Sequence, residues 1–279
     1  MDNMKGNPVT DKTLGPASAE LLLRLSAQGK TIFSVADAQA ITGKHSQVTA
    51  KLLSRMAQRR WLARLVRGKY LIVPLEAGLE NIPMADRYVI AHHVMGSLPY
   101  YISHYSALEL HQMTTQPLNT VHITVRRQRA NQNIAGVEYR FVYANKRAFW
   151  GFESSWVTDQ QQVQVSDLEK TLLDCAARPE LCGGLELAKG LWMRKNDLNE
   201  DRLAAYARRL DHKAAIKRIG FLLETYNLGR PETIASLQNL VNLRYSPLDP
   251  TLPAQGPYRA RWRLCVNLDP EELKTTVWT

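Results

Sequence analysis

Cysteine is scarce in this 279-residue chain, and its apolar runs are short. The three cysteines (Cys175, Cys182 and Cys265) form no C-x-x-C pair, so the sequence predicts neither a disulfide framework nor a zinc knuckle. No apolar run approaches the roughly 18–20 residues of a membrane-spanning helix, and residues 1–11 lack the apolar stretch of a secretion signal. We therefore expect a cytoplasmic protein that does not contact a membrane.

The motifs of several large enzyme classes are also missing. The sequence has no G-x-x-x-x-G-K-[ST] loop, no G-x-G-x-x-G, no H-E-x-x-H and no G-x-S-x-G. His92 and His93 lie in an apolar helical pattern, which favours a packed pair over a metal site. Ser103, His104 and His111 could be a nucleophile with bases, but no acid is placed to orient them, so a helix cap with interfacial histidines is the simpler interpretation. We predict no catalytic residue, no metal and no cofactor.

Positive charge is concentrated at the N-terminal end. The whole chain has 36 Lys and Arg against 26 acids, a net charge of +10, and residues 1–75 alone have 12 against four, a net charge of +8. Such asymmetry indicates a basic module joined to a nearly neutral one, and it suits a polyanionic partner. A solvated basic face has the same composition, so the order of the surrounding elements has to decide.

Periodicity divides residues 1–75 into three helices and a hairpin. The expected helices cover residues 17–27, 35–41 and 47–60. Their expected boundary residues are Gly29, which ends the first helix, and Ser34 and Ser46, which cap the second and third. Two strands follow, at residues 61–66 and 69–73, joined at Arg67 and Gly68. This is the order of a winged helix-turn-helix, in which the third helix enters the major groove of DNA and the wing reaches the neighbouring backbone.

The third helix has an apolar side and a polar side. Val48, Leu52, Leu53 and Met56 fall on one arc and predict a packing stripe. The opposite side carries small residues, amides and cations, which are side chains that can approach and read base edges or hold phosphate. The predicted DNA-binding residues of the helix are Ser46, Gln47, Lys51, Ser54, Arg55, Gln58 and Arg59. Those of the wing are Arg64, Arg67 and Lys69.

The remainder of the chain reads as a linker, residues 76–83, and a larger mixed α+β domain, residues 84–279. The expected helices are residues 84–95, 104–111, 167–177, 185–194, 200–210, 213–225 and 232–241. The expected strands are residues 118–125, 137–142, 148–152, 162–165 and 259–268. Ser166 is expected to cap the helix over residues 167–177, with Glu169 completing a capping box.

A second basic run lies between two of these strands, in the polar hairpin or loop of residues 126–136. Its cations, Arg126, Arg127 and Arg129, have two interpretations: a second phosphate contact, or a solvated loop tip. The sequence does not decide between them.

Four segments resemble signatures of the AbiEi family of type IV antitoxins. They are Y-I-S-H-Y-S-A-L-E-L-H-Q (101–112), V-S-D-L-E-K-T-L-L-D (165–174), R-P-E-L-C-G-G (178–184) and K-R-I-G-F-L-L-E (217–224), and R-L-V-R-G-K-Y (64–70) is similar to the wing of such proteins. The resemblance implies an antitoxin and transcriptional repressor whose N-terminal winged helix binds inverted repeats in its own promoter. It also implies a nucleotidyltransferase-like toxin as functional partner, without a stable complex. We further expect a monomer in solution that assembles cooperatively on double-stranded operator DNA.

Two other functions stay open at this stage. One is a nuclease or nucleotidyl-transferring enzyme tethered to a DNA-binding head, for which Glu153, Asp159 and Asp167 are the carboxylates to test. The other is an adaptor whose winged helix binds protein instead of DNA. The excess of positive charge in residues 1–75 favours the repressor.

Overall fold

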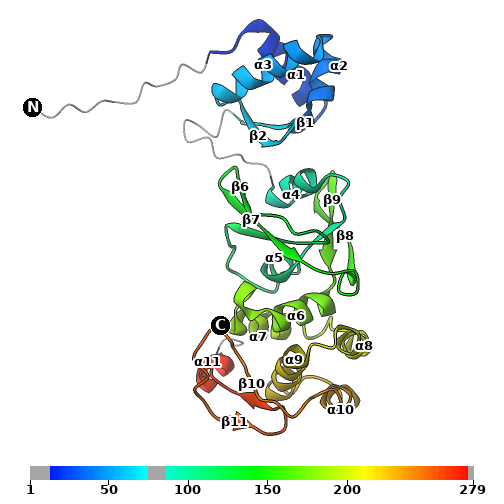
Figure 1. Ribbon diagram of the computed structural model, residues 1–279, viewed down its shortest axis with the longest axis vertical. Coiled ribbons are helices and arrows are strands. Elements are labelled where there is room, and N and C mark those ends of the chain that lie inside the picture. The colour runs from blue at the N-terminus through cyan, green and yellow to red at the C-terminus, as the bar shows by residue number, and fades with distance from the viewer. Residues whose placement is uncertain (1–12, 75–85, 276–279) are drawn as a thin grey trace, which may run out of the picture. The chain divides into compact units, whose positions relative to one another are not determined.

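The computed structural model describes residues 13–74 and 86–275, so the predicted linker at residues 76–83 lies outside the described residues. The chain divides into two compact units. One consists of Met1–Leu98 with Asn133–Val137, and the other of Pro99–Gln132 with Glu138–Thr279. Helices and several sheets alternate along the chain (Figure 1), which confirms the mixed α+β class. No helix among the described residues is long and apolar enough to cross a membrane.

The first unit contains three helices, a small sheet and a further helix. In chain order these are α1 (Pro16–Ala27), β1 (Ile32–Ser34), α2 (Val35–Thr42), α3 (Ser46–Gln58), β2 (Leu62–Val66), β3 (Lys69–Ile72) and α4 (Arg87–Met95). The three-stranded sheet has the order β1-β3-β2, and both pairings are antiparallel. The reversal between β2 and β3 falls at Arg67 and Gly68, where Gly68 has a φ of 80° that suits glycine.

Local chemistry explains why α2 starts where it does. Ser34 caps the helix, since its hydroxyl accepts from the backbone N–H of Asp37 at 3.1 Å and the Asp37 carboxylate accepts from the backbone N–H of Ser34 at 2.8 Å. Lys30 adds an ion pair to the same carboxylate at 2.7 Å. These contacts hold the pKa of Asp37 at about 2, chiefly because of the bond from Lys30. The predicted cap at Ser34 is confirmed.

The packing of α3 differs from the prediction in two respects. Thr49, Leu53 and Met56 form its buried stripe, one helical turn apart, whereas Val48 is 48% exposed, so its assignment to the stripe is wrong. The N-cap is His45 and not Ser46, which is the first helical residue and caps nothing with its side chain. A count of apolar residues overlooks Thr49, which is buried with its hydroxyl donating to the Lys44 carbonyl at 3.3 Å.

Helix α4 groups with the first unit, although the sequence placed it in the second domain. It lies against β2, and the Lys69 ammonium donates to the His93 carbonyl at 3.0 Å. Gly96, with a φ of 57°, ends the helix. Burial and the charge of Lys69 lower the pKa of His93 to about 4, so this histidine is neutral at physiological pH.

The second unit is built on a six-stranded sheet of order β6-β7-β5-β4-β9-β8. Its strands are β4 (Tyr100–Ile102), β5 (Thr120–Val125), β6 (Gln132–Ile134), β7 (Val137–Tyr143), β8 (Phe152–Thr158) and β9 (Gln161–Ser166). Strands β5 and β7 pair in parallel, from Thr120 opposite Glu138 to Val125 opposite Tyr143. Residues 126–131 are therefore a crossover and not the tip of a hairpin. The tight turn is at Ala135 and Gly136, both with positive φ.

Helices and a second, smaller sheet form the rest of this unit. The helices are α5 (His104–Leu110), α6 (Leu168–Ala177), α7 (Gly184–Met193), α8 (Glu200–Leu210), α9 (Lys213–Thr225), α10 (Pro231–Gln238) and α11 (Pro270–Thr275), with a short 3₁₀ turn η2 (Pro179–Leu181). A second three-stranded sheet of order β10-β12-β11 contains β10 (Ser246–Pro247), β11 (Tyr258–Arg259) and β12 (Leu264–Cys265), so the single strand expected over residues 259–268 is wrong. Apolar side chains of α6, α7 and α9 form one buried cluster.

Three further predictions in this unit are corrected. Residues 148–151 are a turn and loop, and strand β8 begins at Phe152. Asp167, not Ser166, caps α6, because Ser166 still belongs to β9 and the Asp167 carboxylate accepts from the backbone N–H of Lys170 at 2.9 Å. Glu169 is not part of a capping box. It is fully buried, accepts from the Asn199 N–H at 2.7 Å and forms an ion pair with Arg202 at 2.6 Å.

Candidate nucleic-acid interface and a polar cavity

One side of α3 is exposed over its whole length. Gln47, Lys51, Ser54, Arg55 and Gln58 are all exposed, and their spacing of three or four residues places them on one face, which we call the α3 face. Ser46 and Arg59 are exposed as well, at the two ends of the helix. The Arg59 guanidinium donates to the Thr13 carbonyl at 3.2 Å. All seven residues predicted on this helix are therefore accessible to a partner.

In residues 13–74, the acids and the unpaired cations lie on different elements. Residues 13–74 contain ten Lys and Arg and two acids, Glu20 and Asp37. Glu20 pairs with Arg24 at 2.7 Å and Asp37 pairs with Lys30 at 2.7 Å. The eight cations left have no ion pair with a described acid. They are Lys44, Lys51, Arg55, Arg59, Arg60, Arg64, Arg67 and Lys69. The uncompensated charge thus lies on α3, on the residues directly before and after it, and on the β2–β3 hairpin.

The predicted wing residues differ from one another in their surroundings. Arg64 and Arg67 are exposed, whereas Lys69 is half-buried and its ammonium is engaged by the His93 carbonyl. Two cations at the hairpin are therefore accessible, and the third is held by α4. The sequence had no means of showing this contact, because Lys69 and His93 are 24 residues apart in the chain.

The second basic run is divided in a similar way. Arg126 and Arg127 are exposed at the carboxyl end of β5. Arg129 is half-buried, with its guanidinium 4.6 Å from the centre of the Phe141 ring, and it donates to Gln132 at 3.4 Å. Burial lowers the pKa of Arg129. Arg126 and Arg127 remain available for a phosphate, while Arg129 also packs on an aromatic ring.

The carboxylates named for an enzyme have different settings. Glu153 and Asp159 are exposed on β8 and on the turn after it. Asp167 is buried, and besides capping α6 it accepts from the Tyr206 hydroxyl at 2.9 Å. Within the described residues, no group of three or more His, Cys, Asp or Glu side chains is placed to hold a metal ion.

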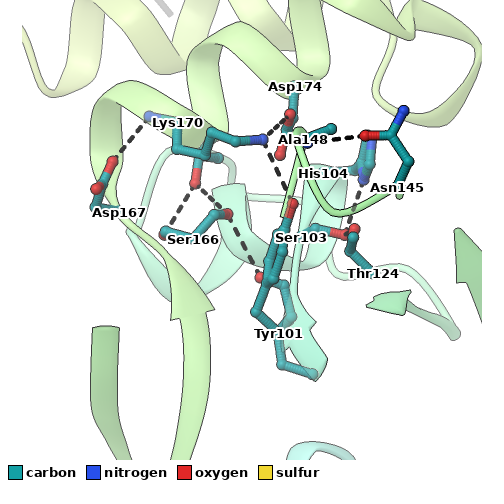
Figure 2. A network of polar contacts seen from close by, with 12 residues as sticks. Tyr101, Ser103, His104, Thr124, Asn145, Ala148, Ser166, Asp167, Lys170 and Asp174 are labelled. Atoms are coloured by element: carbon teal, nitrogen blue, oxygen red, sulfur yellow. Dashed lines mark hydrogen bonds and ion pairs between the residues drawn. The ribbon is translucent and has the colours of Figure 1, made fainter. Parts of the chain in front are cut away.

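A polar cluster that the sequence did not predict joins α6 to strand β4 of the six-stranded sheet (Figure 2). Lys170 is 1% exposed and forms an ion pair with Asp174, one turn further along α6. Its ammonium also donates to the Tyr101 hydroxyl at 3.4 Å and lies 5.0 Å from the centre of the Trp150 ring. Burial raises the pKa of Asp174, against the opposing effect of Lys170. The i,i+4 spacing of Lys170 and Asp174 was visible in the sequence, but their burial was not.

Ser103 and His104 belong to the same cluster. Ser103 accepts from the Thr124 hydroxyl at 2.7 Å and contacts Nδ1 of His104 at 2.8 Å. His104 is fully buried, so its pKa lies well below the ordinary value and the ring is neutral. Its φ of 53° is in the left-handed region, which is uncommon for residues other than glycine. His111 is apart from this cluster, with its Nε2 2.6 Å from the Ser166 carbonyl oxygen.

Comparison with known proteins identifies a similar fold but no family. No family model matches the chain, and no curated protein matches it. The crystal structure of the RV2827C protein from Mycobacterium tuberculosis is similar, with a TM-score of 0.72 and 14% sequence identity over 97% of each chain. At this identity the likeness shows that the two proteins share an α+β fold over nearly their whole lengths.

Proposed function

We propose that residues 13–74 are a winged helix-turn-helix that binds double-stranded DNA. The element order from α1 to β3 and the β1-β3-β2 sheet support this proposal, since a third helix followed by a β-hairpin is the arrangement of that motif. In it, the α3 face enters the major groove, and Arg64 and Arg67 of the β2–β3 hairpin hold the sugar-phosphate backbone. Lys69 contributes to the same charge from its contact with α4.

The observation that carries this proposal is the uncompensated charge around α3. Eight cations in residues 13–74 have no ion pair with a described acid, and Lys51 and Arg55 lie on the exposed α3 face. Cations held beside small residues and amides can approach a base edge and neutralise phosphates at the same time. The two acids, Glu20 on α1 and Asp37 on α2, pair with other cations, so they do not offset the charge of the α3 face.

The wider role is that of a cytoplasmic repressor and antitoxin. Its support is the resemblance of residues 101–112, 165–174, 178–184 and 217–224 to type IV antitoxins of the AbiEi family. On this proposal the protein binds inverted repeats in its own promoter as a monomer that assembles cooperatively. It opposes a nucleotidyltransferase-like toxin without forming a stable complex with it.

The experiment for the DNA-binding role is fluorescence anisotropy with the DNA upstream of the gene and with unrelated duplexes. We expect binding to both, tighter to the upstream DNA, with an affinity that falls steeply as salt rises. Absence of any salt-dependent binding would make the winged helix a protein-binding adaptor instead. Co-expression with the product of the adjacent gene tests the antitoxin role separately, because a variant that no longer binds DNA can still relieve toxicity.

A further inference from the structure

The polar cluster of the second unit borders a cavity of about 230 Å³ at one end of the central strands of the six-stranded sheet. Parallel strands β5 and β7 both end there, at Val125 and Tyr143, which are opposite each other in register. The loop that follows β7 forms one wall of the cavity, and α6 forms another, with Lys170 and Asp174. Open α/β sheets bind ligands at the carboxyl ends of parallel strands, so the position is a natural one for a small molecule.

The walls of the cavity are mostly apolar, and the charges among its lining residues are balanced, since Arg178 pairs with Glu180 at 2.6 Å. Lys170 is neutralised by Asp174, and His104 is neutral. Thr124 donates to Ser103, whose own proton is then available to Nδ1 of His104, and this leaves the ring proton on Nε2. Nε2 makes no hydrogen bond to a described residue, whereas Oδ2 of Asp174 is sealed from solvent. The interior thus offers one donor and apolar walls to a ligand, but no excess charge for an anion.

The rim of the cavity has the opposite character. The turn after β7 is fixed by the side chain of Asn145, whose Oδ1 accepts from the backbone N–H of Arg147 at 2.9 Å and of Ala148 at 3.1 Å. Lys146 and Arg147 at the tip of this turn are exposed, as is Arg126 at the end of β5, and none of the three has an ion pair with a described acid. Cations of this kind favour a phosphate group at the mouth.

We propose that this cavity binds a nucleoside phosphate, with the base inside against His104 and the phosphate on Lys146 and Arg147. A neutral planar base packs on apolar walls and has ring nitrogens or carbonyl oxygens that can accept from Nε2 of His104. The cavity is smaller than the roughly 300–1,000 Å³ of pockets that enclose drug-sized ligands, so it fits a single base and leaves the phosphate outside. The site uses residues of the second unit alone and does not depend on the DNA-binding role.

The test is calorimetric titration of the full-length protein with the four ribonucleoside 5′-monophosphates, the four nucleosides, ribose 5-phosphate and inorganic phosphate. We expect at least one monophosphate to bind at least 10-fold more tightly than its nucleoside, ribose 5-phosphate and inorganic phosphate. The Lys146→Ala/Arg147→Ala variant should lose that 10-fold and keep the affinity for the nucleoside. The control Arg208→Ala/Arg244→Ala removes the same charge from exposed positions of this unit and should change nothing.

A second measurement locates the ligand. In ¹H–¹³C spectra, signals of His104 and Thr124 should shift on titration, whereas those of His45, beside α3, should not. Comparable affinity for free monophosphates and for a 5′-phosphorylated single-stranded trinucleotide assigns the site to free nucleotides, and much tighter trinucleotide binding assigns it to a strand end. The proposal is overturned if no monophosphate binds, if ribose 5-phosphate or inorganic phosphate binds as well as the monophosphates, or if both double variants weaken binding equally.

Discussion

Arg55 follows Lys51 by one turn of α3, and its Nε donates to the Lys51 carbonyl at 3.4 Å while both side chains stay exposed. The bond keeps the Arg55 guanidinium along the α3 face. Two cations, two amides and a serine therefore share one surface of the helix. A surface of this composition combines attraction to phosphate with the ability to read bases.

Gln47 at the start of this face should affect specificity more than affinity. Gln pairs with adenine edges through two hydrogen bonds worth roughly 1–3 kcal/mol of discrimination. We expect Gln47→Ala to relax the preference at one or two base pairs of the upstream DNA. Selection of bound sequences from a randomised library measures this directly. An unchanged sequence preference would mean that Gln47 does not face the bases.

Asp37 should stabilise α2 in a pH-dependent manner. We expect Asp37→Ala to lower the stability of the first unit by about 1 kcal/mol at pH 7, because the capping box and the ion pair to Lys30 are lost together. The folded pKa of Asp37 is about 2, below its unfolded value of about 4, so its contribution is complete above pH 4 and is lost as the pH falls through 2.

Hydrogen exchange of the α2 backbone amides measures this loss of stability. The matched control is Glu20→Ala, which breaks an exposed ion pair on α1 and should have little effect. If both variants exchange alike at pH 7, the capping box does not contribute to the stability of α2.

The buried pair of Lys170 and Asp174 should be more costly to break than to remove. Lys170→Met leaves the Asp174 carboxyl buried without a cation, for which we expect a loss of roughly 3–5 kcal/mol. Because the pKa of Asp174 is raised by burial, this loss should be largest at neutral pH and smaller toward pH 4. Urea unfolding at both pH values measures the difference.

The double variant Lys170→Met/Asp174→Leu supplies the comparison. It removes both charges, so it should recover most of the stability that Lys170→Met loses. A double variant as unstable as Lys170→Met would show that the pair is held for its packing and not for its charge balance.

Local signals predicted much of the first unit and less of the second. The cap at Ser34, the strands on either side of Gly68 and the helix over Lys213–Thr225 depend on neighbours in the sequence, so they were visible in it. The parallel pairing of β5 with β7 depends on a crossover that no periodicity reveals. For the same reason the sequence indicated a capping-box acid at Glu169, where the fold buries this side chain against Asn199 and Arg202.

The candidate sites show the same division. The α3 face could be predicted because a single helix presents it, and only the position of Val48 was assigned to the wrong side. The cavity could not, because it brings together Thr124 of β5, Asn145 after β7 and Lys170 of α6, with His104 of α5. Contacts between segments so far apart in the chain arise only from the fold.

The salt dependence of DNA binding by a charge variant of α3 tests the central claim most directly. Affinity of the full-length protein for the upstream duplex is measured from 50 to 300 mM salt for the natural chain, for Lys51→Ala/Arg55→Ala and for the control Arg208→Ala/Arg244→Ala. The account predicts a slope of log affinity against log salt that is smaller by about 0.9 for each lost phosphate contact in the α3 variant alone. Equal slopes and affinities for all three proteins would contradict it.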